Sequence, residues 1–452
     1  MKKVLDGMER VLMPLAKIIG ENKYLIAIRD GFLISTPMLI IGSLFLLIAN
    51  FPWTPFGDFM ASFLGADWAS KMSVPASASF DVMAILAVVG IGYSLGKQFD
   101  IDAIAAAVLS LVTFFMVTPF FTNYTLEGTE EVVQVTSLPL EWMGSKGLFL
   151  GIIVALLGTR IFAAVIKKGW VIKMPPGVPP TVVKSFEALI PGFIVIFIFF
   201  VISWVFTLTS YGSLQLFIFQ FLQTPLLSLG NTLGAMVIAY LFLHFFWFFG
   251  INGSSVVGAV FNPVLRALSV ENLDAYKNGL PIPNIITGQF QDMFATFGGA
   301  GSTLSLIVVM IFVCKSQRIK KLSQLSLVPG IFGINEPIIF GLPIVLNPIL
   351  LIPFALVPTI NIVIAYFAMS WGWVPFTNGI QLPWTMPIII SGFLVSGWQG
   401  AVLQGLLFIL GMFIYYPFIK VLDDQYLIDE QVATVAEEED DISFDDFDFE
   451  DL

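Results

Sequence analysis

Runs of about 20 apolar residues recur along this 452-residue sequence and constrain its fold more than any other feature. Such a run matches the length of helix that crosses hydrocarbon about 30 Å thick. Only 12% of the residues are charged and 57% are hydrophobic, so a soluble chain could not cover its core with polar surface. We therefore predict an all-α integral membrane protein. The first spans are expected near residues 31–50, 81–96, 104–121, 148–165, 188–208 and 233–249, and further apolar stretches follow through Tyr416.

The placement of Lys and Arg predicts the orientation of these spans. Basic residues precede the first span and follow the fourth, whereas the loop 122–143 has four Glu and no Lys or Arg. We therefore expect the loop outside the cell and the N-terminus in the cytoplasm. Residues 4–19 have the spacing of an amphipathic helix on the membrane surface. By the same rule Arg266, Lys277 and the basic residues of 315–321 are expected on the cytoplasmic side.

Glycine and proline interrupt two of the later apolar stretches. Only about 37 residues separate Lys277 from Lys315, and Gly298–Gly301 divides them. A hairpin that enters from the cytoplasm, turns at the glycines and returns would satisfy the charges; such backbone is tolerated at membrane depth only where it is buried or lines a wet cavity. A second break is Gly333–Pro337. Interrupted hydrophobic segments of this kind are typical of transporter binding sites.

Glu336 lies in the second break and is the only charged residue between Lys321 and Lys420. A lone carboxylate at membrane depth costs several kcal/mol unless it is hydrated, paired or bound to a substrate. Asn335 beside it offers a donor and an acceptor. The sequence therefore favours a ligand-binding carboxylate, and the alternative is a Glu wetted near a short cytoplasmic loop.

Two further segments place an aromatic ring beside amide or hydroxyl groups. Trp247 and Asn252 lie in the segment 244–254, and Trp384 lies in the segment 381–387. An indole can present a flat apolar face to a sugar ring, although aromatic stripes more often face lipid or the core. His244 is expected to be buried and hydrogen-bonded across helices. One carboxylate, several amides and these rings favour a neutral, polyhydroxylated ligand.

Other chemistries find little support. His244 is the only histidine and Cys314 the only cysteine, which excludes a multi-histidine metal site and a disulfide framework, and we expect no metal and no cofactor. Cys314 is interpreted as a packing residue. Gly92–Lys97 is one residue short of a nucleotide-binding loop, so close helix packing through Gly92 and Gly96 is the better interpretation.

The net charge of -11 arises in the tail. Residues 423–452 contain 14 acidic residues and no basic one, which leaves a weakly basic body. No basic footprint of a nucleic-acid-binding protein is present. We expect the segment from Glu437 to Asp451 to be a solvated and disordered cytoplasmic end.

Four motifs in order resemble the membrane permease, enzyme IIC (EIIC), of bacterial phosphotransferase systems (PTS), in its lactose, cellobiose and N,N′-diacetylchitobiose branch. These motifs are WFFGINGSSVVG (247–258), FGGAGSTLSL (297–306), GINEPIIFGLPIVLNP (333–348) and LPWTMP (382–387). The segment IRDGFLISTPMLIIGS (28–43) is similar too, so the resemblance extends to about residue 420.

The resemblance implies a homodimer in the bacterial cell membrane, with about ten transmembrane helices, two re-entrant hairpins and both termini in the cytoplasm. It implies an N-terminal dimerisation domain over residues 1–230 and a C-terminal sugar-binding domain over 231–422, followed by the acidic tail 423–452. An elevator-like movement of the sugar-binding domain would carry a β-linked disaccharide inward. Its 6-hydroxyl would then receive a phosphoryl group from a cysteine of a separate EIIB subunit.

Carried over by motif, the residues that would contact the sugar are Trp247, Asn252, Ala300, Ser302, Asn335, Glu336 and Trp384. Glu336 would bind the accepting hydroxyl and is the candidate general base. The family usually has histidine where this chain has Asn252, and an amide cannot gain a proton near neutral pH. The alternative function is an ion-coupled secondary sugar transporter, which normally needs several membrane-embedded ionisable groups.

Overall fold

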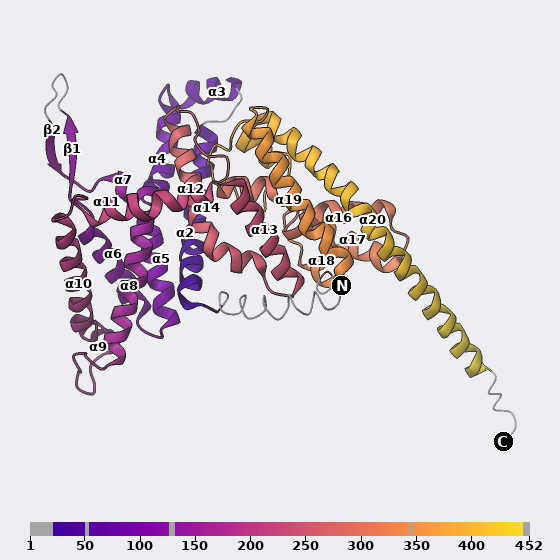
Figure 1. Cartoon of the computed structure of the whole chain (residues 1–452), viewed down its shortest axis with the longest axis horizontal. Coiled ribbons are helices and arrows are strands. Elements are labelled where there is room, and N and C mark those ends of the chain that lie inside the picture. Colours follow the sequence, from indigo (N-terminus) through magenta and orange to yellow (C-terminus); the bar gives the residue numbers. More distant parts are fainter. Residues whose placement is uncertain (1–20, 50–53, 126–131, 343, 345–346, 446–452) are drawn as a thin grey trace. The chain divides into compact units, whose positions relative to one another are not determined.

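A computed structural model describes residues 21–49, 54–125, 132–342, 344 and 347–445 (Figure 1). The predicted N-terminal amphipathic helix lies outside these residues. The chain forms two compact units, each made of segments that are discontinuous in sequence. Unit 1 comprises Met1–Met236, Ser254–Gln289 and Phe376–Pro383, and unit 2 comprises Val237–Gly253, Phe290–Pro375 and Trp384–Leu452. The functional division expected at residue 230 stays a prediction.

Unit 1 is a helical bundle in which α2, α4, α5, α6 and α8 pack against one another. Its helices are α2 (Lys23–Ala49), α3 (Thr54–Leu64), α4 (Trp68–Phe80), α5 (Met83–Gln98), α6 (Ala103–Val117), α7 (Leu140–Met143), α8 (Leu148–Lys167), α9 (Pro180–Glu187), α10 (Leu189–Thr207), α11 (Leu214–Ile218) and α12 (Thr224–Gly230), with most of α14 (Gly253–Lys277) and α15 (Gly288–Phe290). Glycines allow the close contacts. A Cβ on Gly92 would lie 2.6 Å from Ser110 Oγ, and one on Gly96 would lie 2.9 Å from Ala103 Cα. The predicted packing role of Gly92 and Gly96 is confirmed.

The segment that follows α6 contains the only two strands of the described residues. β1 (Phe121–Thr125) pairs antiparallel with β2 (Val132–Thr136), with Phe121 opposite Thr136. In Figure 1 this hairpin extends from the helices of unit 1. The predicted span 104–121 is too long, because α6 ends at Val117, two residues before Pro119, and the residue that precedes a proline disfavours helix.

If the loop 122–143 lies outside the cell, as predicted, then the predicted cytoplasmic position of Lys277 is wrong. Lys277 Nζ lies 3.1 Å from Asp81 Oδ1, at the end of α5 that adjoins Gly144, the residue after the loop 122–143. The opposite end of α5 carries the Gln98 carbonyl, which accepts a hydrogen bond from Lys23 Nζ at 2.9 Å. The positive-inside rule counts Lys and Arg in short loops, and Lys277 is instead paired within the unit. The charge argument for a hairpin that enters from the cytoplasm therefore loses its support.

Arg266 is likewise not in a loop. It lies inside α14, where its Nη1 donates to Gln381 Oε1 at 2.8 Å. Among the described residues, eight helices are long and apolar enough to cross a membrane, or up to nine if the bent pair Leu214–Gly230 and Leu233–Phe248 is one span. The all-α prediction is therefore confirmed in its class, and the ten helices and two re-entrant hairpins stay predictions.

Unit 2 is built around a hydrophobic cluster that includes Ile307, Met310, Ile338, Phe354 and Tyr415. Its helices are most of α13 (Leu233–Phe248), α16 (Thr303–Val313), α17 (Gln317–Ile331), α18 (Glu336–Gly341), α19 (Pro348–Ser370) and α20 (Ile390–Asp445). A π-helical turn, η3 (Gln291–Ala295), and a short 3-10 turn, η4 (Ala300–Ser302), precede α16.

The acidic tail differs from its prediction. α20, yellow in Figure 1, continues as helix to Asp445, whereas disorder was expected from residue 437. Alanine and glutamate in the segment 433–439 are good helix formers, and the tail extends a helix that tertiary contacts already hold. Residues 446–452 lie outside the described part of the chain.

Candidate functional site

All seven residues predicted to contact sugar belong to unit 2. They come from three of its sequence segments: the end of α13, the region from η4 to α18, and the segment that begins at Trp384. The structure therefore gathers in one compact body residues that lie up to 137 positions apart in the sequence.

The glycine loop 297–302 has a backbone that only glycine adopts readily. Gly298, Gly299 and Gly301 have φ of +75°, +91° and +79°, and Ser302 follows at +56°. Side chains other than glycine rarely enter this region. A Cβ on Gly301 would overlap the Phe354 ring, and one on Gly299 would overlap the Asn335 amide. The loop is therefore both left-handed and tightly enclosed.

Two helices hold the peptide groups of Gly301. His244 on α13 accepts a hydrogen bond from the Gly301 N–H through Nε2 at 2.9 Å, and its Nδ1 lies 2.7 Å from the Tyr240 carbonyl oxygen. The ring is thus neutral with its proton on Nδ1. Tyr415 on α20 donates its hydroxyl to the Gly301 carbonyl at 2.6 Å. The prediction that His244 is a buried, cross-helix hydrogen-bonding residue is confirmed.

Ser302 is committed to the loop itself. Its side chain is fully buried, and Oγ accepts from Phe297 N at 3.2 Å and from Asn361 Nδ2 at 3.1 Å. Asn361 Nδ2 also donates to the Ala295 carbonyl at 3.2 Å. In this structure the Ser302 hydroxyl positions the loop, and its contact with sugar stays a prediction.

Asn335 joins the two breaks that the sequence singled out. Its Nδ2 donates to the Ala300 carbonyl at 2.8 Å, and its side chain is buried. Because Asn335 is also the N-cap residue of α18, this one amide ties the glycine loop to the segment that carries Glu336. This contact between the two breaks, Gly298–Gly301 and Gly333–Pro337, cannot be predicted from the sequence of either one.

Glu336 and Trp384 are exposed, as is Asn252. Glu336 opens α18, where a helix N-terminus favours a negative charge, and its side chain is exposed to solvent. A Cβ on Gly333 would lie 3.1 Å from two ring carbons of Trp384, so the indole lies directly against the break. Trp384 remains 60% exposed. The predicted enclosure of Glu336 at membrane depth is not tested by this structure and stays a prediction.

Trp247 and Asn252 lie where α13 ends. Gly250 has φ of +76°, its N–H donates to the Trp247 carbonyl at 3.0 Å, and Ile251 N–H donates to the Phe246 carbonyl at 3.0 Å. A left-handed glycine of this kind terminates a helix. Trp247 is partly buried against the hydrophobic cluster of unit 2, and Asn252 is exposed in the turn before α14.

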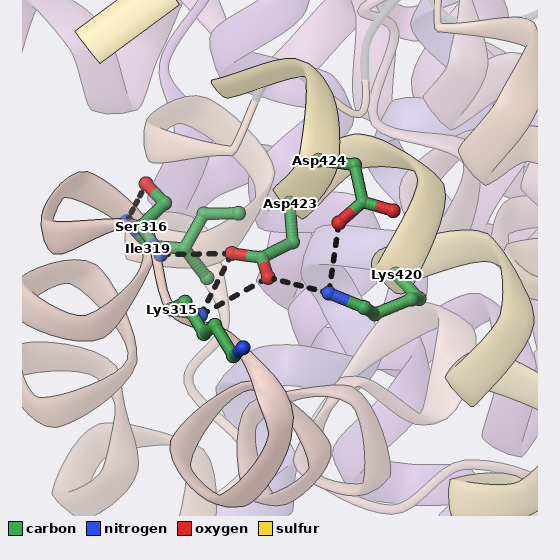
Figure 2. A network of polar contacts seen from close by, with 6 residues as sticks. All are labelled: Lys315, Ser316, Ile319, Lys420, Asp423 and Asp424. Atoms are coloured by element: carbon green, nitrogen blue, oxygen red, sulfur yellow. Dashed lines mark hydrogen bonds and ion pairs between the residues drawn. The ribbon is translucent and has the colours of Figure 1, made fainter. Parts of the chain in front are cut away.

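Asp423 is a residue whose role the sequence reasoning missed, because it was assigned to a solvated tail. Figure 2 shows its carboxylate at the junction of α16 and α17, where Oδ1 accepts from the backbone N–H groups of Lys315 and Ser316 at 2.9 Å each. Lys420 Nζ lies 3.2 Å from its Oδ2. The side chain is fully buried. A usable signal was the helical spacing of Tyr415, Ile419 and Leu422, which continues the buried face to this position.

Within the described part of the chain, no group of three or more His, Cys, Asp or Glu side chains could hold a metal ion. Cys314 is buried beside the same junction, and burial raises the pKa of its thiol to about 12. The chemistry available in unit 2 is therefore hydrogen bonding by amides and a carboxylate beside an exposed indole.

Comparison with known proteins identifies relatives along almost the whole chain. The family model described as "Phosphotransferase system, EIIC" matches residues 29–358. The "Lichenan permease IIC component" of Bacillus subtilis (strain 168) is 40% identical over 95% of this chain and 96% of its own length. The "PTS system cellobiose-specific EIIC component" of Geobacillus stearothermophilus is 40% identical over 95% of this chain and 97% of its own.

A solved structure is similar as well. It is the transporter ChbC, "the IIC component from the N,N'-diacetylchitobiose-specific phosphotransferase system", with a TM-score of 0.91 and 44% identity. The alignment covers 94% of this chain and 99% of that one. The resemblance recognised in the four sequence motifs is confirmed, and so is the membrane fold.

Proposed function

The chain belongs to the EIIC family of the phosphotransferase system, and on this premise we propose that it carries a β-linked disaccharide into a bacterial cell. Lichenan, cellobiose and diacetylchitobiose, after which the relatives are named, all contain β-linked sugar units. The sugar's 6-hydroxyl is presented on the cytoplasmic side to a separate, phosphorylated EIIB protein. The relatives support this substrate class.

The observation that carries the proposal is the hydrogen bond from Asn335 Nδ2 to the Ala300 carbonyl. It joins a rigid glycine loop to a segment with an exposed carboxylate and an indole that lies against Gly333. Carboxylate and amide groups bind sugar hydroxyls, while an indole face covers the apolar C–H face of a pyranose. Trp247 and Asn252 complete the proposed contacts.

In the proposed reaction Glu336 accepts a hydrogen bond from the 6-hydroxyl and orients its oxygen. That oxygen forms a bond to phosphorus as the bond between phosphorus and the EIIB cysteine sulfur breaks. The hydroxyl proton passes to the Glu336 carboxylate, which acts as a general base. Its exposed position supports this role because both the sugar and a protein donor must reach it.

The assembly follows the family. A homodimer forms through the domain 1–230, the domain 231–422 carries the sugar, and both termini lie in the cytoplasm. The basic residues that flank the first and fourth spans support this orientation. Asn252, where the family usually has histidine, serves as a neutral hydrogen-bonding group and takes no part in proton transfer.

Replacing Glu336 with glutamine tests the central residue. Sugar phosphorylation by phosphorylated EIIB should fall about a hundredfold or more, the usual loss when a general base is removed. Sugar affinity should fall about tenfold or more, because a hydrogen bond to a charged group is lost. Asp424→Asn is the matched control, since Asp424 is an exposed carboxylate of the same unit. Unchanged phosphorylation by the Glu336→Gln protein would remove this residue from the mechanism.

Transport into vesicles separates this function from an ion-coupled transporter. Uptake should require the phosphodonor and should not respond to an imposed proton gradient. Uptake that follows the proton gradient in the absence of the phosphodonor would reject the proposal.

A further inference from the structure

We propose that the outward face of α17 is the docking surface for the phosphorylated donor protein, an inference that rests on the proposed function. The face is formed by Lys321, Leu325, Val328 and Phe332. These positions follow the i, i+4, i+7, i+11 spacing of one helix face. We refer to them as the α17 face.

The opposite face of α17 packs inside unit 2. Ile319, Ser323, Ser326 and Gly330 are buried. The α17 face is exposed instead, with Leu325 at 74% and Val328 at 63%. α17, which has 15 residues, is not among the helices long and apolar enough to cross a membrane on their own. A contiguous exposed apolar stripe rimmed by polar groups marks an interaction site.

The charge of this region complements a phosphorylated partner. Residues 315–335 contain four basic residues and no acid. The carboxylate of Glu430 accepts from Ser316 Oγ at 2.7 Å and from Arg318 N at 3.0 Å, so it binds the start of α17 rather than the lysine side chains. Among the described residues, neither Lys320 nor Lys321 forms an ion pair. Their positive charge is available to a phosphoryl group or to acidic side chains around it.

The α17 face leads to the proposed acceptor site. It runs from the basic residues at the start of the helix to Phe332, four residues before Glu336. A protein seated along it could therefore bring its phosphorylated side chain to the sugar held at Glu336. The start of the helix is also hydrogen-bonded to α20, since Asp423 and Glu430 accept from its first backbone N–H groups (Figure 2 shows Asp423).

A lipid surface fits this pattern less well than a protein. A helix on a bilayer separates its charged side from its apolar side. In α17 one side is already buried in the unit, and the basic and apolar residues follow one another along the remaining face. A face with basic residues at one end and apolar residues along the rest matches a protein interface with a basic end and an apolar centre.

The test uses the full-length chain with purified, phosphorylated EIIB. In Lys321→Gln/Leu325→Ser, the EIIB concentration for half-maximal sugar phosphorylation should rise at least about tenfold, as expected for the loss of one buried leucine from an interface. The maximal rate and the sugar affinity should stay within about twofold of the original protein, because the sugar site is untouched. Lys168→Gln/Ile172→Ser is the matched control, an exposed basic and apolar pair with the same spacing in unit 1. An unchanged requirement for EIIB in the α17 variant would overturn the proposal.

A second measurement does not depend on the double variant folding. Val328→Cys, combined with Cys314→Ala to remove the native thiol, should react with a maleimide in lipid nanodiscs and be protected by phosphorylated EIIB. Protection without EIIB in nanodiscs, but not in detergent, would assign the face to lipid and overturn the proposal. Protection that rises with the concentration of this chain alone would assign it to a second copy and overturn it equally. Loss of docking with sugar binding intact leaves the proposed function standing, whereas failure to bind any β-linked disaccharide would reject that function instead.

Discussion

Replacing His244 with phenylalanine should weaken sugar binding through the glycine loop. The change preserves an aromatic ring for the edge contact with Phe354, whose centroid lies 5.1 Å away, and removes the acceptor for the Gly301 N–H. A buried donor without a partner costs about 1–3 kcal/mol. If the loop must keep this arrangement to bind sugar, the dissociation constant should rise by about 5- to 150-fold, since 1.4 kcal/mol corresponds to tenfold.

Titration calorimetry of the sugar with the purified protein measures this shift. Tyr415→Phe is the companion variant, because it removes the hydrogen bond to the Gly301 carbonyl while a carbonyl oxygen tolerates the loss of a donor better than a buried N–H tolerates the loss of an acceptor. The two changes act on one residue, so their effects on affinity should not be additive. A His244→Phe protein that melts at a lower temperature yet binds sugar normally would show that the loop is not part of the binding site.

Three further predictions concern the supports of the fold. Asp423→Ala should lower the free energy of unfolding by about 2 kcal/mol or more, because two backbone donors lose a charged acceptor, while Asp424→Ala should cost less than about 0.5 kcal/mol; thermal melting of both variants measures the difference. Asp102→Ala should lower the free energy of unfolding by about 1 kcal/mol, since Asp102 caps α6 by accepting from Ala105 N, and this hydrogen bond holds the pKa of its carboxyl below the usual value. A lowered pKa stabilises the fold at neutral pH, and this stabilisation is lost as the pH falls through the folded pKa. The melting temperatures of the two proteins should therefore converge in acid. Cys314, with a pKa of about 12, should react with maleimide at pH 8 on the order of a thousandfold more slowly than an ordinary cysteine, and rapid labelling of the folded protein would contradict its burial.

Several features of this protein could be predicted from local sequence. Apolar runs specify membrane spans because lipid leaves the backbone no partner but itself, so helices follow from length and composition. The break around Glu336 was also visible, because a charge, an amide and a proline interrupt apolar residues over five positions. Four motifs then pointed to the EIIC family.

Other features depended on contacts that no local pattern encodes. Lys277 counts as an inside charge in sequence, but its ion pair with Asp81, 196 positions earlier, places it at the same end of α5 as the loop 122–143, which was predicted to lie outside. Asp423 belongs by composition to an acidic tail, yet it is buried against the start of α17. In both cases the partner of a charge decides its environment, since an ion pair or a helix cap offsets the cost of desolvation.

In the candidate site, too, some features follow from local sequence and others depend on tertiary contacts. The sequence alone determined which residue types could bind a sugar, because their chemistry and the helix breaks are local properties. Only the tertiary structure decided that Asn335 ties the glycine loop to the Glu336 segment and that His244 holds Gly301. These hydrogen bonds join residues 35 and 57 positions apart, and such contacts exist only once packed helices bring their buried polar groups together.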